Sequence, residues 1–189
     1  THNELANMLR DNIYINGIEE FDLPHTLDCG QAFRWKCDEN GLWSGVAGDK
    51  FLSLEKLKDG TVVLYNTSAT EFNDFWRDYF DLDRDYEKIR EILSQNETLK
   101  AACDYSYGIR ILNQQPFETL CSFIISQNNN IGRIKGIIER LCEGFGEEKN
   151  GYYAFPTPEK MATLTVDDLA PLRSGFRAKY LVDAAQKIA

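Results

Sequence analysis

Three consecutive asparagines are the most unusual polar feature of this sequence. Asn128, Asn129 and Asn130 lie between an apolar segment, residues 117–125, and a segment with an apolar stripe, residues 131–145. Their side chains offer amide donors and carbonyl acceptors at the point where a helix would begin and its first backbone N–H groups would point outward. Such a cluster can cap the helix or bind a polar ligand. Both interpretations stay open from these residues alone.

A second candidate segment runs from Leu27 to Trp35 and has the sequence LDCGQAFRW. The simplest interpretation of its glycine, Gly30, is a turn. Elsewhere the sequence holds no HExxH motif, no GxSxG motif and no glycine-rich phosphate loop. Neither His2 nor His25 has an obvious nucleophile beside it. No constellation within the sequence therefore indicates a catalyst.

Charge is distributed unevenly along the chain. A net charge of −9 argues against a nucleic-acid partner, because phosphate binding depends on Lys and Arg. However, residues 1–113 contain 12 basic and 21 acidic groups, whereas residues 114–189 contain 9 of each. Two short basic segments, residues 126–140 and 173–180, lie in this neutral part. Solvated helix faces have the same composition, so charge alone favours that simpler interpretation.

Hydrophobic periodicity predicts an α+β fold. Between Ile13 and Thr67, short aromatic and β-branched runs separated by glycines predict an antiparallel meander sheet. A helix beginning near residue 70 is expected to cover one face of this sheet, because its apolar residues recur every three or four positions. Further helices are expected at residues 86–93, 99–103, 117–125, 131–145, 156–161, 166–172 and 175–189. The last keeps its helical period to Ala189, so we expect the sequence to be cut within a helix.

Length and composition fit one large or two small folded domains, since 43% of the 189 residues are hydrophobic. We expect a sheet domain at residues 1–113 and a helical domain at residues 114–189. No stretch approaches the roughly 20 apolar residues that cross a bilayer, and the first residues lack a signal-peptide core, so we expect a cytoplasmic protein without a membrane partner. Five cysteines without a CxxC pair predict reduced, mostly buried thiols and neither a metal nor a cofactor.

Five blocks of the sequence together resemble the 8-oxoguanine DNA glycosylases. In order, they are DCGQAFRW with the following WSGV, YFDLD, PFETLCSFIISQNNNIGRI, RLC with FG, and GFRAKY. The blocks occur in the family's order and cover nearly all of the chain. The resemblance implies an antiparallel sheet domain similar to half of a TATA-binding protein. An α-helical glycosylase domain follows it, and here it stops before the family's helix-hairpin-helix motif.

By this resemblance, the Gly30 carbonyl oxygen distinguishes damaged guanine from normal guanine. The oxidised base has an N–H donor at N7, where guanine has a lone pair, so a backbone carbonyl attracts the first and repels the second. Two acceptors facing each other without water would cost about 1 to 3 kcal/mol. The resemblance also places Gln31 and Phe33 at the base, which a glycosylase must rotate out of the duplex.

The family pattern further implies a set of DNA contacts in the neutral part of the chain: Asn128, Asn129, Asn130, Arg133, Phe176 and Arg177. Asn128 would enter the gap left by the rotated base. Arg133 and Arg177 would bind the unpaired cytosine, whose acceptors suit the donors of a guanidinium. Phe176 would wedge into the base stack, at a position where the family commonly has tyrosine. Both short basic segments contain one of these arginines.

The family's nucleophilic lysine and its assisting aspartate lie beyond the helix that begins here at Phe176, so the resemblance assigns no catalytic residue to this chain. Lys135 and Lys179 lie on predicted helices among exposed charges, where a lysine stays protonated and poorly nucleophilic. We expect the intact protein to excise 8-oxoguanine opposite cytosine and to nick the strand by β-elimination. We expect residues 1–189 alone to cleave nothing.

Three other hypotheses stay open. The chain could be a non-catalytic module that binds DNA and senses lesions, a glycosylase for alkylated bases, or a protein-interaction domain of the same fold. The leading hypothesis predicts damaged double-stranded DNA as the partner. It also predicts a monomer in the bacterial cytosol.

Overall fold

The computed structural model describes residues 11–18 and 20–189. Its contacts divide the chain into two compact units. The first, which we call the sheet unit, contains the residues up to 31, residues 36–44 and residues 52–113. The second, which we call the helical unit, contains residues 32–35, 45–51 and 114–189. Among the described residues, no helix combines the length and the apolar content that crossing a bilayer requires.

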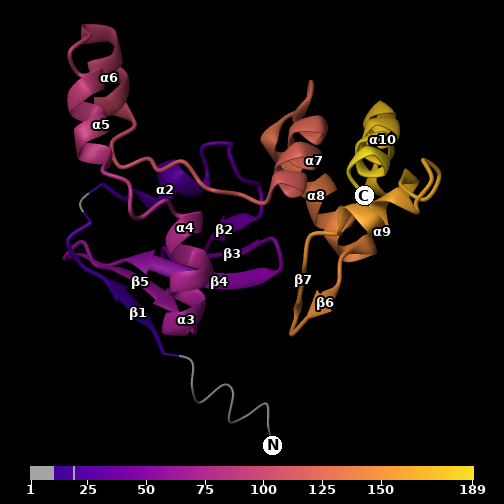
Figure 1. Ribbon diagram of the computed structural model, residues 1–189, viewed down its shortest axis with the longest axis horizontal. Helices are drawn as coiled ribbons and strands as arrows, with labels where there is room; N and C mark the ends of the chain where they lie inside the picture. Colours follow the sequence, from indigo (N-terminus) through magenta and orange to yellow (C-terminus); the bar gives the residue numbers. More distant parts are fainter. Residues whose placement is uncertain (1–10, 19) are drawn as a thin grey trace, which may run out of the picture. The chain divides into compact units, whose positions relative to one another are not determined.

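Five strands form one sheet in the order β1-β5-β4-β3-β2 (Figure 1). Their bounds are Ile13–Ile15 (β1), Trp35–Cys37 (β2), Trp43–Ala47 (β3), Lys50–Lys56 (β4) and Val62–Tyr65 (β5). Strand β5 pairs antiparallel with both β1 and β4, with Leu64 opposite Ile13 and Leu54. Alternate residues of β3 and β4 are buried, as expected for a sheet with one covered face. The predicted antiparallel sheet is therefore confirmed. Its meander comprises β2 to β5, whereas β1 pairs with β5 and not with its sequence neighbour β2.

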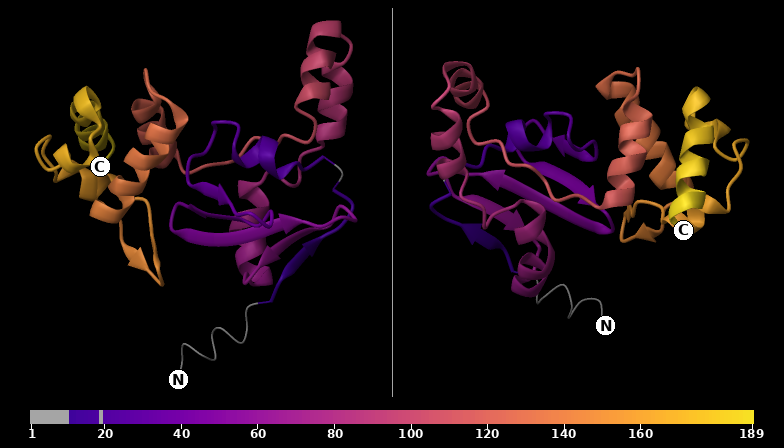
Figure 2. Two further views of the ribbon diagram at one scale, coloured as in Figure 1. Left: turned by 180° about the vertical axis from the view of Figure 1, so that it is seen from behind. Right: turned by 45° about the horizontal axis from the view of Figure 1, so that its top comes forward.

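Helical turns after β5 lie across one face of the sheet in Figures 1 and 2. They are α3 (Ala69–Glu71), a π-helical turn η1 (Phe72–Trp76) and α4 (Arg77–Tyr79). Ser68 caps the first turn by accepting a hydrogen bond from the Glu71 amide. Trp76 and Phe80 are fully buried, and their rings stack with centroids 5.8 Å apart. The helix predicted near residue 70 thus exists and contains a π turn.

The remaining helices of the sheet unit are α2 (Leu23–Leu27), α5 (Tyr86–Leu93) and α6 (Glu97–Tyr105). Helices α5 and α6 lie side by side, as expected from the periodicity (Figure 2). Helix α2 was not predicted, because its five residues include Pro24 and show too few turns for a period. Asp22 caps it by accepting a hydrogen bond from the His25 amide at 2.8 Å.

The helical unit contains α7 (Pro116–Ser126), α8 (Ile131–Phe145), α9 (Pro158–Ala162) and α10 (Ala178–Ile188). Their inward faces form one hydrophobic core that includes Cys121, Ile125, Ile137, Leu141 and Leu181. A short hairpin of β6 (Glu148–Lys149) and β7 (Tyr152–Tyr153) was not predicted. Its turn, Asn150-Gly151, has positive φ at both residues, and this dipeptide is a known hairpin signal.

One predicted helix is wrong. Residues 166–172 were expected to be helical, but only Ala170–Leu172 form a 3₁₀ turn, η2. Thr165 and Asp168 form the reciprocal pair of a helix start, in which Asp168 accepts from the Thr165 amide at 2.7 Å and the Asp168 amide donates to the Thr165 hydroxyl at 3.3 Å. The helix does not continue, because Pro171 has no backbone N–H to donate to the Asp167 carbonyl. The segment from 175 is a 3₁₀ turn η3 (Gly175–Arg177) that continues into α10. The α+β fold class is confirmed.

Candidate functional site

The predicted base-recognition residue lies in an exposed loop of the sheet unit, between α2 and β2. Gly30 has φ +90, a left-handed conformation that favours glycine. An added Cβ would meet no atom within 4 Å, so backbone conformation and not crowding explains the residue type. The loop lies outside the strands, and no hydrogen bond among the described residues uses the Gly30 carbonyl oxygen. That oxygen can therefore accept a hydrogen bond from a ligand.

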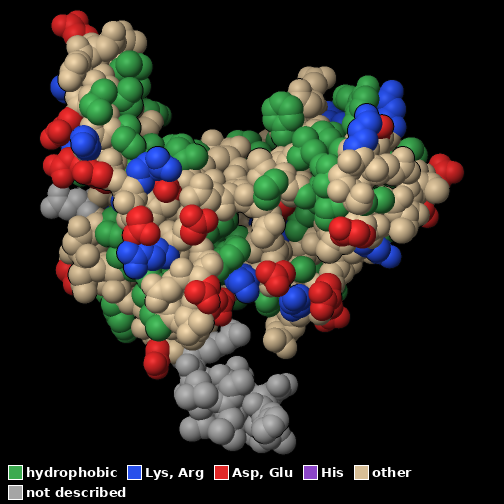
Figure 3. Space-filling model, viewed as in Figure 1, with side chains coloured by type: hydrophobic (Ala, Val, Ile, Leu, Met, Phe, Trp, Pro, Cys, Tyr) green, Lys and Arg blue, Asp and Glu red, His purple; other side chains and the backbone are tan. Residues whose placement is uncertain are grey.

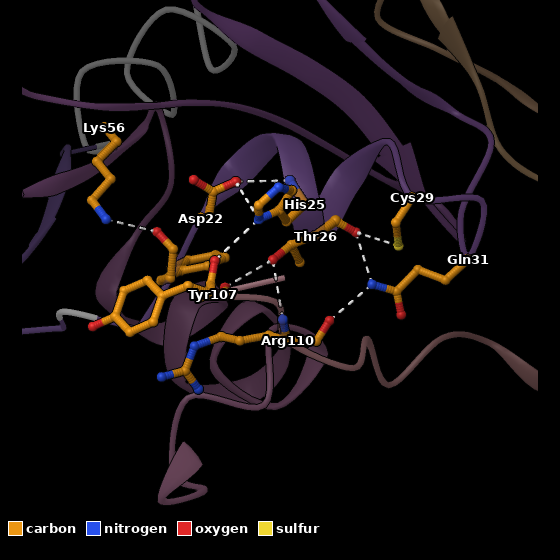
Figure 4. Close-up of polar contacts among 10 residues, drawn as sticks. Asp22, His25, Thr26, Cys29, Gln31, Lys56, Tyr107 and Arg110 are labelled. Atoms are coloured by element: carbon orange, nitrogen blue, oxygen red, sulfur yellow. Dashed lines mark hydrogen bonds and ion pairs between the residues drawn. The ribbon is translucent and has the colours of Figure 1, made fainter. Parts of the chain in front are cut away.

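Gln31, the next residue, directs its side chain toward the protein backbone (Figure 4). Its Nε2 donates to the carbonyl oxygens of Thr26, at 2.7 Å, and Arg110, at 2.8 Å. Its Oε1 accepts from the Leu112 amide at 3.1 Å. A neutral amide has two N–H donors, so these bonds use both of them. The contact of Gln31 with the base stays a prediction. These two N–H donors are not available for it, so other atoms of the residue would have to make the contact.

Phe33, the third residue predicted at the base, belongs to the helical unit. It is half-buried and packs against the hydrophobic core of that unit. Its role at the base stays a prediction.

The three asparagines occupy the turn between α7 and α8, in the helical unit. Asn129 donates from Nδ2 to the Ile125 carbonyl at 3.1 Å, and Asn130 accepts the Arg133 amide at 2.9 Å as the N-cap of α8. Asn128 differs from both. It is exposed, has φ 48, and its side chain makes no hydrogen bond among the described residues. The capping interpretation therefore accounts for Asn129 and Asn130, and Asn128 is available for a ligand.

Arg177 is the least expected member of this group, because only 3% of it is exposed. Its Nε donates to the Gln127 carbonyl at 3.0 Å, and its Nη2 donates to the Gln127 and Asn128 carbonyls, the latter at 2.9 Å. Its Nη1 donates to the Ser174 carbonyl at 3.2 Å. The guanidinium carbon lies 4.5 Å from the centroid of the Phe176 ring. In this structure Arg177 fixes the backbone of the asparagine turn, and its contact with cytosine stays a prediction.

Arg133 and Phe176 present their side chains to solvent on the same unit. Arg133 makes one long hydrogen bond, 3.3 Å, from Nη2 to the Arg173 carbonyl. Phe176 is 57% exposed, and its ring packs edge to face against the Tyr180 ring, with the two ring centroids 6.4 Å apart. An exposed guanidinium and an exposed ring next to Asn128 can bind a polar base edge and stack on a base.

Two of the thiols are buried in the core of the helical unit and are poor nucleophiles there. Cys121 and Cys142 are buried, and burial raises the pKa of each thiol to about 12. Cys29 and Cys37 are exposed, so the prediction of mostly buried thiols is wrong for them. The Lys179 ammonium lies over the Tyr180 ring at 4.8 Å. The described part of the chain contains no cluster of His, Cys, Asp or Glu residues suited to a metal.

Comparison with known proteins identifies the family. Residues 13–120 match the family described as 8-oxoguanine DNA glycosylase, N-terminal domain. The chain belongs to the 8-oxoguanine DNA glycosylase family. The remaining residues, 121–189, match the family described as HhH-GPD superfamily base excision DNA repair protein.

Individual relatives of the chain agree with the family. The N-glycosylase/DNA lyase of Saccharomyces cerevisiae is 32% identical, over 89% of this chain and 50% of the yeast protein. A structure of MBOgg1 in complex with a low affinity DNA ligand is 47% identical with a TM-score of 0.88, over 94% of this chain and 62% of that one. Clostridium acetobutylicum 8-oxoguanine glycosylase/lyase was solved with double-stranded DNA containing cytosine opposite 8-oxoG. It is 44% identical with a TM-score of 0.89, over 94% of this chain and 62% of that one. The chain spans about half the length of the curated relatives it matches.

Sequence reasoning missed buried polar residues that hold loops and turns of each unit in place. Thr26 is fully buried, and its hydroxyl accepts the Arg110 amide at 3.2 Å. In the helical unit, Arg34 lies 3.7 Å from Glu118 and donates to the Gly48 and Tyr153 carbonyls. Most of these partners are backbone atoms, which carry no side-chain signal in a sequence.

Proposed function

We propose that the protein containing this chain excises 8-oxoguanine paired with cytosine from double-stranded DNA and then cleaves the abasic strand. The observation that carries the proposal is the Gly30 carbonyl, exposed in a left-handed loop and without a protein hydrogen-bond partner among the described residues. A peptide oxygen in such a loop can accept a hydrogen bond from the N7–H group of the oxidised base, whereas it repels the N7 lone pair of normal guanine.

The surface of the helical unit supports a DNA partner despite the acidic chain. Asn128, Arg133 and Phe176 are exposed there, and Arg173 and Lys179 add two exposed positive charges. Figure 3 shows basic side chains beside hydrophobic ones over the region of α10. Excess acid is confined to residues 1–113, so a cationic and aromatic face exists within a chain of net charge −9.

These residues supply recognition, and we propose that the catalytic lysine and aspartate lie elsewhere in the protein. The Clostridium acetobutylicum enzyme, which is 44% identical, was solved with a duplex that contains cytosine opposite 8-oxoG. This similarity supports the same substrate for the protein containing this chain. We propose that the protein acts on chromosomal DNA as a monomer in the bacterial cytosol. We also propose residues 1–113 and 114–189 as the two domains of the chain, with residues 32–35 and 45–51 of the first needed to complete the helical unit.

The experiment uses the full-length protein and three duplexes that differ at one position: 8-oxoguanine opposite cytosine, an alkylated purine, and undamaged guanine. We expect excision of the oxidised base only, and a covalent adduct with that duplex after borohydride reduction. Excision of the alkylated base in preference to the oxidised one would refute the proposal, as would the absence of any adduct. Residues 1–189 alone should give no adduct, because no lysine among them is assigned to attack the sugar.

A further inference from the structure

The loop that carries Gly30 must be rigid if its carbonyl is to distinguish two bases by the hydrogen that only the oxidised one carries at N7. Glycine loses more conformational freedom on folding than any other residue, so a left-handed glycine in an exposed loop needs fixing by its neighbours. Preceding it, Cys29 makes only a weak contact, 3.8 Å from its sulfur to the Thr26 carbonyl. Strong fixation therefore has to come from the residue that follows.

Gln31 makes that connection with both ends of its amide, and Figure 4 shows the two bonds that its Nε2 donates. On one side, Nε2 binds the carbonyl of Thr26, near the end of α2. On the other side, Nε2 and Oε1 bind the Arg110 carbonyl and the Leu112 amide, in the extended segment that follows α6. The single side chain next to Gly30 thus joins two separate backbone segments. In the second segment, Arg110 and Leu112 lie 79 and 81 residues from Gln31 along the chain.

Both anchor segments are themselves fixed. Thr26 is fully buried, and its hydroxyl accepts the Arg110 amide at 3.2 Å. Arg110 is 4% exposed, and its guanidinium donates to the Glu20 and Asp81 carbonyls, at 2.8 and 2.7 Å. A movement of Gln31 would break hydrogen bonds to buried backbone groups, which are costly to leave unpaired. The orientation of the Gly30 peptide is therefore coupled to the core of the sheet unit through one amide.

We infer that Gln31 is a positioning residue that sets the direction of the Gly30 carbonyl, and so controls recognition of the oxidised base without donating to it. This inference rests on the proposed function. Its amide donors are used by Thr26 and Arg110, so the base meets the Gly30 oxygen and the glutamine acts through that oxygen. A misplacement of about 1 Å in a positioned group can cost about 100-fold in rate.

The test compares two reactions of the full-length protein, one that needs base recognition and one that does not. The first is single-turnover excision of 8-oxoguanine opposite cytosine. The second is cleavage of a preformed abasic site opposite cytosine, where no base has to be read. For Gln31→Ala we expect excision to fall about 10- to 100-fold, with abasic-site cleavage unchanged.

Two further variants sharpen the result. Gln31→Glu keeps an acceptor for the Leu112 amide but places a carboxylate oxygen against two carbonyl oxygens, so its excision should be at least as slow as that of Gln31→Ala. Asn73→Ala is the matched control, because it also removes a side-chain amide bond to a backbone carbonyl, 2.8 Å to Ala69, in a different part of the sheet unit. Both of its reactions should equal those of the wild type.

Equal loss of excision and abasic-site cleavage in Gln31→Ala would overturn the inference, because the residue would then support only the fold. Unchanged excision would overturn it too. A wild-type protein that cleaves abasic sites but leaves 8-oxoguanine in place would instead refute the proposed function, so the two failures are distinguishable.

Discussion

The sheet unit and the helical unit each place a candidate recognition loop beside a buried arginine, but they use the arginine in opposite ways. Near Gly30, the backbone of Arg110 binds Gln31 and Thr26, whereas its guanidinium binds the carbonyls of Glu20 and Asp81. Near Asn128, the guanidinium of Arg177 binds the loop itself, through the carbonyls of Gln127 and Asn128.

The surroundings of the two guanidinium groups differ in the same sense. Arg110 lies over the rings of Phe21 and Tyr86, at 5.6 and 4.6 Å, and Phe21 is fully buried. Arg177 lies over Phe176, which is mostly exposed. Both arginines are nevertheless buried, with 4% of Arg110 and 3% of Arg177 exposed, so both belong to the interior of their units. The Gly30 loop is thus fixed by neutral groups and the asparagine turn by a charge.

Replacing Arg110 should have the largest effect on stability. Arg110→Ala removes two hydrogen bonds from a charged donor and leaves the Glu20 and Asp81 carbonyls without it, so we expect the free energy of unfolding to fall by about 3 to 5 kcal/mol. Burial lowers the pKa of this guanidinium, which shows that its charge is held against a desolvation cost. Chemical denaturation measures the change in the free energy of unfolding. A loss below about 1 kcal/mol would contradict a large contribution of Arg110 to stability.

Replacing Arg177 should combine a stability effect with a DNA effect. Arg177→Ala removes the bonds to Gln127, Asn128 and Ser174, so we expect a loss of about 2 to 4 kcal/mol. Affinity for a lesion duplex should fall as well, because the turn that carries Asn128 loosens. Arg173→Ala is the control at an exposed arginine and should change stability by less than about 0.5 kcal/mol. Equal stability of the two variants would remove the contrast between Arg177 and a surface arginine.

Arg133→Ala should affect DNA and leave the fold alone. Its guanidinium is exposed and makes only the 3.3 Å bond to the Arg173 carbonyl. We expect the preference for cytosine opposite the lesion to weaken by about 1 to 3 kcal/mol, with an unchanged unfolding midpoint. Excision rates measured opposite each of the four bases test this. A uniform loss opposite all four would mean that Arg133 contacts phosphate only.

Gly30→Ala should destabilise the protein modestly and impair recognition. A residue with a Cβ at φ +90 costs about 1 kcal/mol in stability. Gly60→Ala is a close control, because Gly60 has φ +88 and equally open space around an added Cβ. Both variants should lose the same stability, whereas only Gly30→Ala should lose excision of 8-oxoguanine. Similar excision rates for the two variants would show that Gly30 does not take part in recognition of the base.

The smallest effect is expected from the pH dependence of Glu118 in the helical unit. Burial raises the pKa of this carboxyl, although Arg34 and the Gly48 amide oppose the shift. A raised pKa in the folded state means that protonation favours folding, so this group stabilises most at low pH and that contribution is lost as pH rises through its pKa. Relative to Glu118→Gln, the wild type should gain stability on acidification from pH 7 toward about 4. A difference independent of pH would contradict the shift.

The sequence predicted the fold well where hydrophobic periodicity is long. Helices α7 and α8 and the five-stranded sheet follow directly from apolar runs and glycine spacing. Periodicity did not predict the short elements correctly, because α2 has only five residues and η2 only three. The β6–β7 hairpin had a usable signal in Asn150-Gly151 that periodicity alone does not detect.

For the candidate site, resemblance proposes residues and does not indicate their partners in the fold. Resemblance to the family singled out Gly30, Asn128 and Arg177, but not what fixes them. Arg177 binds carbonyls 49 and 50 residues away, and Gln31 binds backbone groups about 80 residues away. Every residue has such a carbonyl, so nothing in its type marks it as a partner. This is why Gln31 could be expected at the base while its donors bind the main chain.

The core of the helical unit includes residues that are synthesised well before its helices. Residues 32–35 and 45–51 belong to it, and Gly48 exchanges hydrogen bonds with Glu118 and Phe155. Such separation along the chain makes assembly slow, since the closing contacts cannot form until the ribosome has added the later segments. Expression of residues 114–189 by themselves should therefore yield an aggregation-prone product, and fragments meant for biophysical work should begin before β1.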